Sequence, residues 1–212
     1  MKLPFRPTKI ASRYLNGLLK GKRTGKIVFS ALNKALHDET FRNFVENNPV
    51  FNALLRNTIS LTMLQSGDKV NVIPAESTAY FDARILPDVK HENFLNQVRK
   101  MAGRDVEVHL VGKTDSGASP FDTPYFKEIA KIVRNAKGNI PVLPFLTTGA
   151  TDLRYFRSLG IPSYGFFPAK FTRQEVMAMH GVNERIPLTA LEEGLEGTRR
   201  ILAFLASYDP VQ

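Results

Sequence analysis

The first 57 residues show apolar positions spaced for short helices rather than for one long stripe. Glycines at 21 and 25 and the Asn47–Pro49 run interrupt the pattern and separate the segments. Four helices are predicted: Thr8 to Lys20, Ile27 to His37, Glu39 to Glu46, and Pro49 to Asn57. Because no segment forms a continuous apolar stripe, these helices are expected to pack on a larger body.

The next segment changes to the alternating pattern of β-strands. Ile59–Leu64 and the stretch from Ser77 to Ile85 alternate and are rich in β-forming residues, and Ser66–Asp68 between them is typical of a turn. A helix is predicted from His91 to Ala102, ended by Gly103, and a third strand from Val106 to Val111. This order predicts an antiparallel α+β layer with helices on one face.

Beyond the Ser116–Pro120 stretch, helices alternate with short apolar strands. A helix is predicted from Pro124 to Lys137, capped by Asp122 or Thr123, and another from Leu153 to Leu159. Short strands are predicted over 142–145 and 161–167, an alternation that favours a partial parallel α/β sheet. The sequence therefore predicts two domains, residues 1–115 and residues 116–212.

The last predicted helix begins at Leu188 and carries an amphipathic stripe. Its apolar-face positions recur at alternating spacings of three and four residues: Leu188, Leu191, Leu195, Thr198, Leu202 and Leu205.

Composition narrows the class of protein. The chain has 212 residues, 43% of them hydrophobic, and no cysteine, which excludes disulfides, cysteine nucleophiles and cysteine-based zinc sites. No apolar stretch approaches the roughly 18 residues needed to span a bilayer. The start lacks the apolar core of a secretory signal, so a cytoplasmic location is the default expectation.

The net charge of +9 resides almost entirely in the first 30 residues, which hold eight Lys or Arg and no Asp or Glu. The other 182 residues carry 21 basic and 20 acidic groups. Such a basic, helical arm can bind nucleic acid or an anionic surface. Since aromatic side chains are not regularly interleaved with it, we expect a solvated helix face rather than a nucleic-acid-binding one.

Three segments contain candidate functional residues, and each of them also has a purely structural explanation. His180 lies in a polar loop, Met179–Arg185, between apolar segments, whereas His37, His91 and His109 fall within helix or strand patterns typical of surface or packing residues. Arg154 occupies the first turn of a predicted helix, where a cation opposes the helix dipole. This suggests an anionic ligand, but an ion pair with Asp152 would explain it equally well.

The third segment contains Asn71 and Arg84, which stand at the two ends of a predicted strand segment. A salt bridge between Asp82 and Arg84 on one strand face is the plainer explanation for the arginine. The chain carries no phosphate-binding loop, nucleophile elbow, HExxH helix or dinucleotide fingerprint.

Taken in order, four motifs resemble the zinc aminoacylase and carboxypeptidase-S metallopeptidases, over about residues 49–206. The motifs are Asn71–Ala75 with Asp82–Arg84, Gly149–Arg154, Gly160–Pro162, and His180–Arg185. The resemblance implies a catalytic domain that binds two zinc ions and an inserted ferredoxin-like lid that often forms a homodimer contact. It further implies hydrolysis of N-acyl amino acids, or of peptides with a free carboxylate, by a metal-activated water and a glutamate base.

The resemblance also implies roles for five residues. His180 corresponds to the last metal ligand, Asn71 and Arg84 to lid residues that orient substrate, and Arg154 to the group that binds the substrate carboxylate. Thr151 corresponds to a hydroxyl near the scissile group.

The chain lacks several of the motifs that supply metal ligands and the general base in the family it resembles. It has no His-x-Asp motif, and its Glu-Glu pair, Glu192–Glu193, stands at the wrong spacing in the last helix. The general-base glutamate is therefore absent, and we expect the C-terminal portion of such an enzyme, which is inactive alone and does not hold zinc stably. Two other classes remain open: a non-catalytic interaction or dimerisation subunit, and a basic nucleic-acid-binding module.

Overall fold

The computed structural model describes residues 3–19, 23–24, 27–28, 32–114, 117–138 and 140–208. The chain divides into two compact units. The first contains Met1–Ala118 and Leu143–Leu159, and the second contains Ser119–Val142 and Gly160–Gln212. Within the described part of the chain, no helix has both the length and the apolar character needed to cross a membrane.

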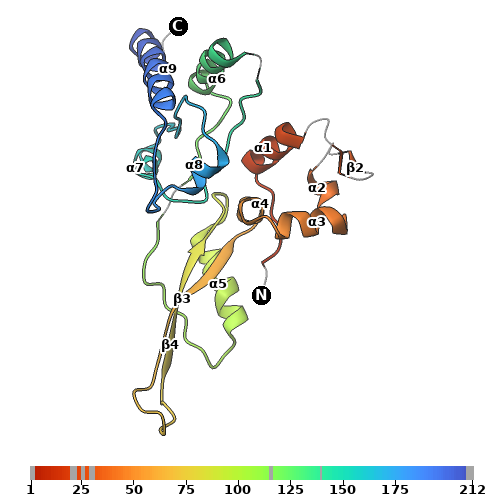
Figure 1. Ribbon diagram of the computed structural model, residues 1–212. Coiled ribbons are helices and arrows are strands. Elements are labelled where there is room, and N and C mark those ends of the chain that lie inside the picture. Colours follow the sequence, from red (N-terminus) through yellow and green to blue (C-terminus); the bar gives the residue numbers. More distant parts are fainter. Residues whose placement is uncertain are drawn as a thin grey trace. The chain divides into compact units, whose positions relative to one another are not determined.

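Four helices lie near the start of the described part of the first unit (Figure 1). They are α1 (Lys9–Leu19), α2 (Leu32–Ala35), α3 (Glu39–Glu46) and α4 (Pro49–Leu55). Asp38 accepts a hydrogen bond from the Phe41 N–H at the start of α3, and Asn48 accepts one from the Phe51 N–H at the start of α4. A short antiparallel pair, β1 (Arg23–Thr24) with β2 (Ile27–Val28), precedes α2.

These helices supply the core of the first unit. The buried cluster contains side chains from α1 to α4 and the adjacent Leu36: Ala11, Leu15, Leu32, Ala35, Leu36, Phe41, Val45, Leu54 and Leu55. Tyr14 of α1 meets Phe145 edge to face, with ring centroids 5.0 Å apart. Because α1 buries Ala11 and Leu15 in this cluster, the part of the basic segment that forms α1 packs into the fold.

A long hairpin follows, formed by β3 (Thr58–Ser66) and β4 (Ser77–Arg84) (Figure 1). The register pairs Thr58 with Arg84 at one end and Ser66 with Ser77 at the other, with an irregularity between Leu61 and Met63. Gly67 opens the connection with a φ of 58°, a conformation that glycine adopts without strain. The helices α5 (His91–Ala102) and α7 (Leu153–Ser158) complete the first unit.

The second unit contains α6 (Pro124–Lys137), α8 (Arg173–Met177) and α9 (Leu188–Ser207), with α6 and α9 side by side (Figure 1). The Ser119 hydroxyl donates to the Ser163 carbonyl and accepts from the Ser163 N–H, both at 2.8 Å. The Tyr164 hydroxyl donates to the Pro120 carbonyl at 2.6 Å. These bonds fasten the chain before α6 to the extended segment before α8.

Several predicted elements differ from the structure. The segments 106–111, 142–145 and 161–167 are extended but form no strand, because no neighbouring strand among the described residues pairs with their backbone. The predicted helix from Ile27 to His37 is wrong at its start, where Ile27 and Val28 form β2; both are β-branched and favour extended backbone. The described part of the chain is thus a mixed fold of helices and antiparallel strand pairs, without the predicted parallel sheet.

Candidate functional site

Arg154 and Thr151 lie together at the start of α7. The Arg154 N–H donates to the Thr151 carbonyl at 3.2 Å, so the two residues belong to the same turn. Asp152 precedes the helix but makes no side-chain capping bond. The Thr151 side chain is exposed beside the first turn of the helix.

The Arg154 guanidinium has an aromatic neighbour instead of an acidic one. Its Nη2 donates to the Tyr155 hydroxyl at 2.8 Å, and its central carbon lies 4.7 Å from the centroid of the Tyr155 ring. The Nε atom is buried and has no hydrogen-bond partner among the described residues. The alternative explanation for Arg154, an ion pair with Asp152, is not found in the structure.

Tyr155 was not among the residues singled out from the sequence. Its only sequence signal is that an aromatic residue follows a cation in a first helical turn, which is too common to indicate a site. The structure shows that Tyr155 holds the guanidinium through both its hydroxyl and its ring.

Arg84 and Asn71 occupy opposite ends of the β3–β4 hairpin. Arg84 is the last residue of β4, and its Nε donates to the Asp82 carboxylate at 2.7 Å, with both side chains about half exposed. Asn71 lies in the connection after Ser66 and before Ser77. At roughly 3.3 Å per residue, the eight residues of β4 separate these ends by about 25 Å, more than one amino-acid-sized molecule spans.

His180 lies in the loop before α9 with a backbone conformation that is uncommon outside glycine. Its φ is 63°, and no other described residue except glycine has a positive value. The His180 N–H donates to the Glu184 carboxylate at 3.0 Å, which ties the turn together. Outliers of this kind store strain and cluster at functional sites, so the geometry motivates a functional role. His180 belongs to the second unit and Arg154 to the first, and their predicted proximity stays a prediction.

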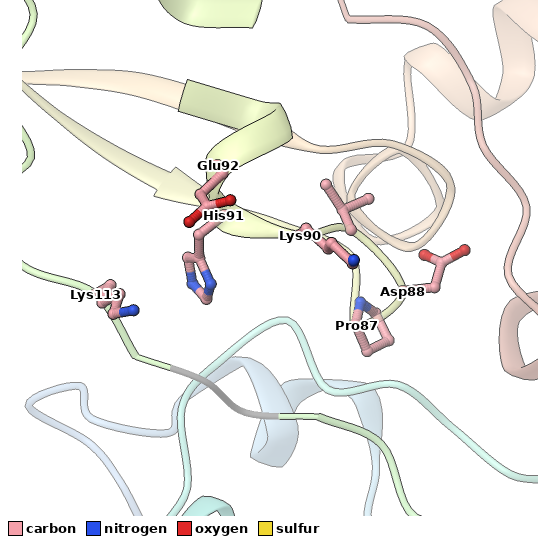
Figure 2. Close-up of a pocket in the computed structure, with 7 residues that line it drawn as sticks. Pro87, Asp88, Lys90, His91, Glu92 and Lys113 are labelled. Carbon is pink, nitrogen blue, oxygen red and sulfur yellow. The ribbon is translucent and has the colours of Figure 1, made fainter. Parts of the chain in front are cut away.

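A pocket in each unit contains none of the predicted site residues. In the first unit, Lys90, His91 and Lys113 surround an open space of about 420 Å³ together with the carboxylates of Asp88 and Glu92 (Figure 2). Asp88 is already paired with Arg6 at 3.3 Å. In the second unit, an apolar pocket of about 410 Å³ lies between α6 and α9.

The described residues do not form a metal centre. No group of three or more His, Cys, Asp or Glu side chains among them could hold an ion. A zinc site needs at least three protein ligands, so His180 alone does not fit one. No chemical step through zinc follows from these residues.

One shift in pKa is large among the described residues, and it lies outside the predicted site. Hydrogen bonds from Arg199, then Arg200, lower the pKa of Glu196 on α9 to about 2. On α8, the Thr172 backbone and hydroxyl lower the pKa of Glu175 by completing a capping box. Both carboxylates make their hydrogen bonds within or at the end of a helix, so their lowered pKa values are explained by helix stabilisation.

Comparison with known proteins gives matches over most of the chain. Residues 7–108 match the family described as Peptidase dimerisation domain. Human Aminoacylase-1 is 29% identical over 93% of this chain, and rat Aminoacylase-1A (Rattus norvegicus) is 30% identical over the same share. The N-fatty-acyl-amino acid synthase/hydrolase of zebrafish (Danio rerio) is 30% identical over 74% of the chain.

The match covers only part of each relative. The chain spans 48% of either aminoacylase and 32% of the zebrafish protein. No solved structure matches the chain.

Proposed function

We propose that this chain, a relative of the aminoacylase-type metallopeptidases, is the C-terminal portion of a zinc-dependent amidohydrolase and binds the carboxylate of its substrate. The substrate class is N-acyl amino acids, or peptides with a free carboxylate. The proposal is supported by relatives named aminoacylase and N-fatty-acyl-amino acid synthase/hydrolase, and by the match to a peptidase dimerisation domain.

The observation that carries the proposal is the state of Arg154. Among described residues no carboxylate pairs with it, its Nε is buried without a partner, and Tyr155 holds the guanidinium from one side. A buried donor without a hydrogen bond is costly, and an incoming carboxylate would supply the missing acceptor. The planar guanidinium matches the two oxygens of a carboxylate, which makes the pair strong and directional.

Thr151, Asn71 and Arg84 are also proposed to contact the substrate. Thr151, in the same turn as Arg154, offers a hydroxyl near the bound substrate. Asn71 and Arg84 orient substrate from separate ends of the hairpin, so the two are expected to act independently. The hairpin and α5 form part of a ferredoxin-like lid whose open β3 edge is the contact in a homodimer.

His180 is the proposed metal ligand of the complete enzyme, in which two zinc ions are held. Zinc, when bound, would polarise the amide carbonyl and activate water. Because the remaining ligands and the general base are not among these residues, we expect this chain alone to bind carboxylate without hydrolysing the amide.

The test measures binding of an N-acyl amino acid to the chain by calorimetry. Arg154→Ala should weaken binding about tenfold or more, since an ion pair with a bidentate carboxylate is lost. Arg157→Ala, one turn further along α7, serves as the matched control and should leave the affinity unchanged. The methyl ester of the same ligand should bind the unmodified chain as weakly as the acid binds the Arg154→Ala variant. Equal affinities for acid and ester would rule out carboxylate recognition.

A second candidate is a non-catalytic subunit completed in trans by another polypeptide. The observation that favours it is the set of extended segments without strand partners, at 106–111, 142–145 and 161–167. Co-expression with a polypeptide equivalent to the unmatched part of Aminoacylase-1 should produce a stable complex. Amide hydrolysis by the complex, abolished by a chelator, would identify it as one enzyme in two pieces, whereas a stable but inactive complex would favour the non-catalytic subunit.

A further inference from the structure

The side chains of Arg154 and Tyr155 meet although the two residues are neighbours on the same short helix, α7. Adjacent residues of an α-helix point about 100° apart, so helix geometry alone does not bring their side chains together. Here the Arg154 Nη2 donates to the Tyr155 hydroxyl at 2.8 Å, and the guanidinium carbon lies 4.7 Å from the ring centroid. The long arginine side chain therefore bends toward the ring, and two separate interactions with Tyr155 fix where the guanidinium lies.

Tyr155 is an uncharged partner, which distinguishes Arg154 from Arg84. The Arg84 Nε donates to the Asp82 carboxylate at 2.7 Å, so its charge is already matched by an anion. A phenol hydroxyl accepts a hydrogen bond without neutralising the cation that donates it. The contact with Tyr155 thus orients the Arg154 guanidinium and leaves its positive charge available for an anion.

The guanidinium also keeps donors for a further ligand. It carries five N–H groups, and the Tyr155 hydroxyl accepts from one of its nitrogens. Among the described residues its buried Nε has no acceptor. Tyr155 is itself 58% exposed, so this pair of side chains is open to an incoming molecule. The two oxygens of a carboxylate match two of the remaining donors.

We infer that Tyr155 is a positioning residue for carboxylate recognition, because it holds the Arg154 guanidinium in the orientation that receives the substrate. This inference rests on the proposed function of Arg154. Since Tyr155 already restrains the long side chain, less conformational entropy is lost when the carboxylate binds. Tyr155 acts through Arg154 and needs no bond of its own to the substrate.

Calorimetry with an N-acyl amino acid and with its methyl ester tests the inference. Tyr155→Phe keeps the ring but loses the acceptor and should weaken binding of the acid about threefold, whereas Tyr155→Leu loses both and should weaken it about fivefold. The ester, which lacks the charge, should bind the natural chain and both variants equally. Phe156→Leu removes a ring of similar exposure, 51%, from the same helix and should leave the affinity for the acid unchanged. Far-UV circular dichroism shows whether each variant folds.

Combining substitutions separates positioning from direct contact with the substrate. In the Arg154→Ala background, Tyr155→Phe should have no further effect on binding, since a residue that acts through Arg154 then has nothing to position. Equal weakening by Tyr155→Phe in both backgrounds would mean that the hydroxyl binds the substrate directly and would overturn the inference. Unchanged affinity in Tyr155→Phe and Tyr155→Leu, with Arg154→Ala still weakened, would overturn it too and would leave the proposed function intact.

Nitrogen NMR of the ligand-free chain supplies a readout that needs no substrate. The Arg154 side-chain signals are identified by their loss in Arg154→Lys. The natural chain should show separate resonances for the two Nη atoms, because the contact with Tyr155 slows rotation of the guanidinium, and Tyr155→Leu should show one averaged resonance. An averaged resonance in the natural chain would overturn the inference. Equal binding of acid and ester by the natural chain would instead overturn the proposed function, and the inference with it, whatever the resonances show.

Discussion

Three arginines show how differently one residue type can be surrounded in the same chain. Arg56 is buried, lies 3.7 Å above the Phe5 ring and pairs with Glu46 at 3.0 Å. Arg84 pairs with Asp82 in solvent. Arg154 alone of these three has an aromatic neighbour and no carboxylate among described residues. The sequence could not distinguish them, because burial and pairing depend on residues far apart in the chain.

Arg56→Ala should destabilise the fold by roughly 3 kcal/mol, since it removes a charged partner of the mostly buried Glu46 carboxylate and the guanidinium that covers the Phe5 ring. Arg84→Ala, which breaks an exposed pair, should change the free energy of unfolding by less than about 1 kcal/mol. Urea unfolding of both variants measures the difference. Equal losses would mean that the Arg56 pair is solvated.

The lowered pKa of Glu196 predicts that the stability of the fold depends on pH. Bonds from Arg199 and Arg200 lower its pKa from the usual 4.5 to about 2 in the folded chain. Between these values the unfolded chain binds more protons, so the stabilisation is complete above pH 4.5 and declines as the pH falls toward 2. Thermal unfolding across this range should show a shallower loss of stability for Glu196→Gln than for the natural chain. Parallel curves would contradict the shift.

At the scale of elements, helices could be predicted from the sequence because their signals are local. The caps and spacing that predict α3, α5, α6 and α9 lie within each segment, and the structure confirms these helices to within about a turn. Strands depend on a partner elsewhere in the chain. β3 and β4 are neighbours joined by a turn and form as predicted, whereas 106–111 and 161–167 have strand-like sequences but no adjacent strand among described residues.

The cap of α4 offers a direct test of this local control. Asn48 accepts a hydrogen bond from the Phe51 N–H at 3.1 Å, and the helix it starts carries Leu54 and Leu55 into the core. Asn48→Ala should therefore lower the free energy of unfolding by about 1 kcal/mol. Asn48→Asp, which keeps the acceptor, should retain most of the stability, as measured by chemical unfolding. A loss as large in Asn48→Asp as in Asn48→Ala would show that the cap is not responsible.

At the scale of the molecule, the division into two units limits what either can do alone. Arg154 belongs to the first unit and His180 to the second, so a site that uses both requires the units to act together. The relatives are two to three times longer than the matched segment, and the predicted metal site draws on ligands outside it. The sequence indicated the individual residues, and their assembly into one site stays a prediction.

Measuring zinc binding tests the prediction that the metal site needs ligands outside the matched segment. After incubation with zinc and removal of free metal, elemental analysis of the chain should give well below two equivalents, because a single imidazole lacks the three ligands of a stable site. His180→Ala should abolish the residual binding if that imidazole is the ligand, while His109→Ala, an exposed histidine beside Glu107, should not. Adding the complementary polypeptide should raise the content to two equivalents for the natural chain and fewer for His180→Ala. Two tightly held equivalents on the chain alone would show that its ligands had been misidentified.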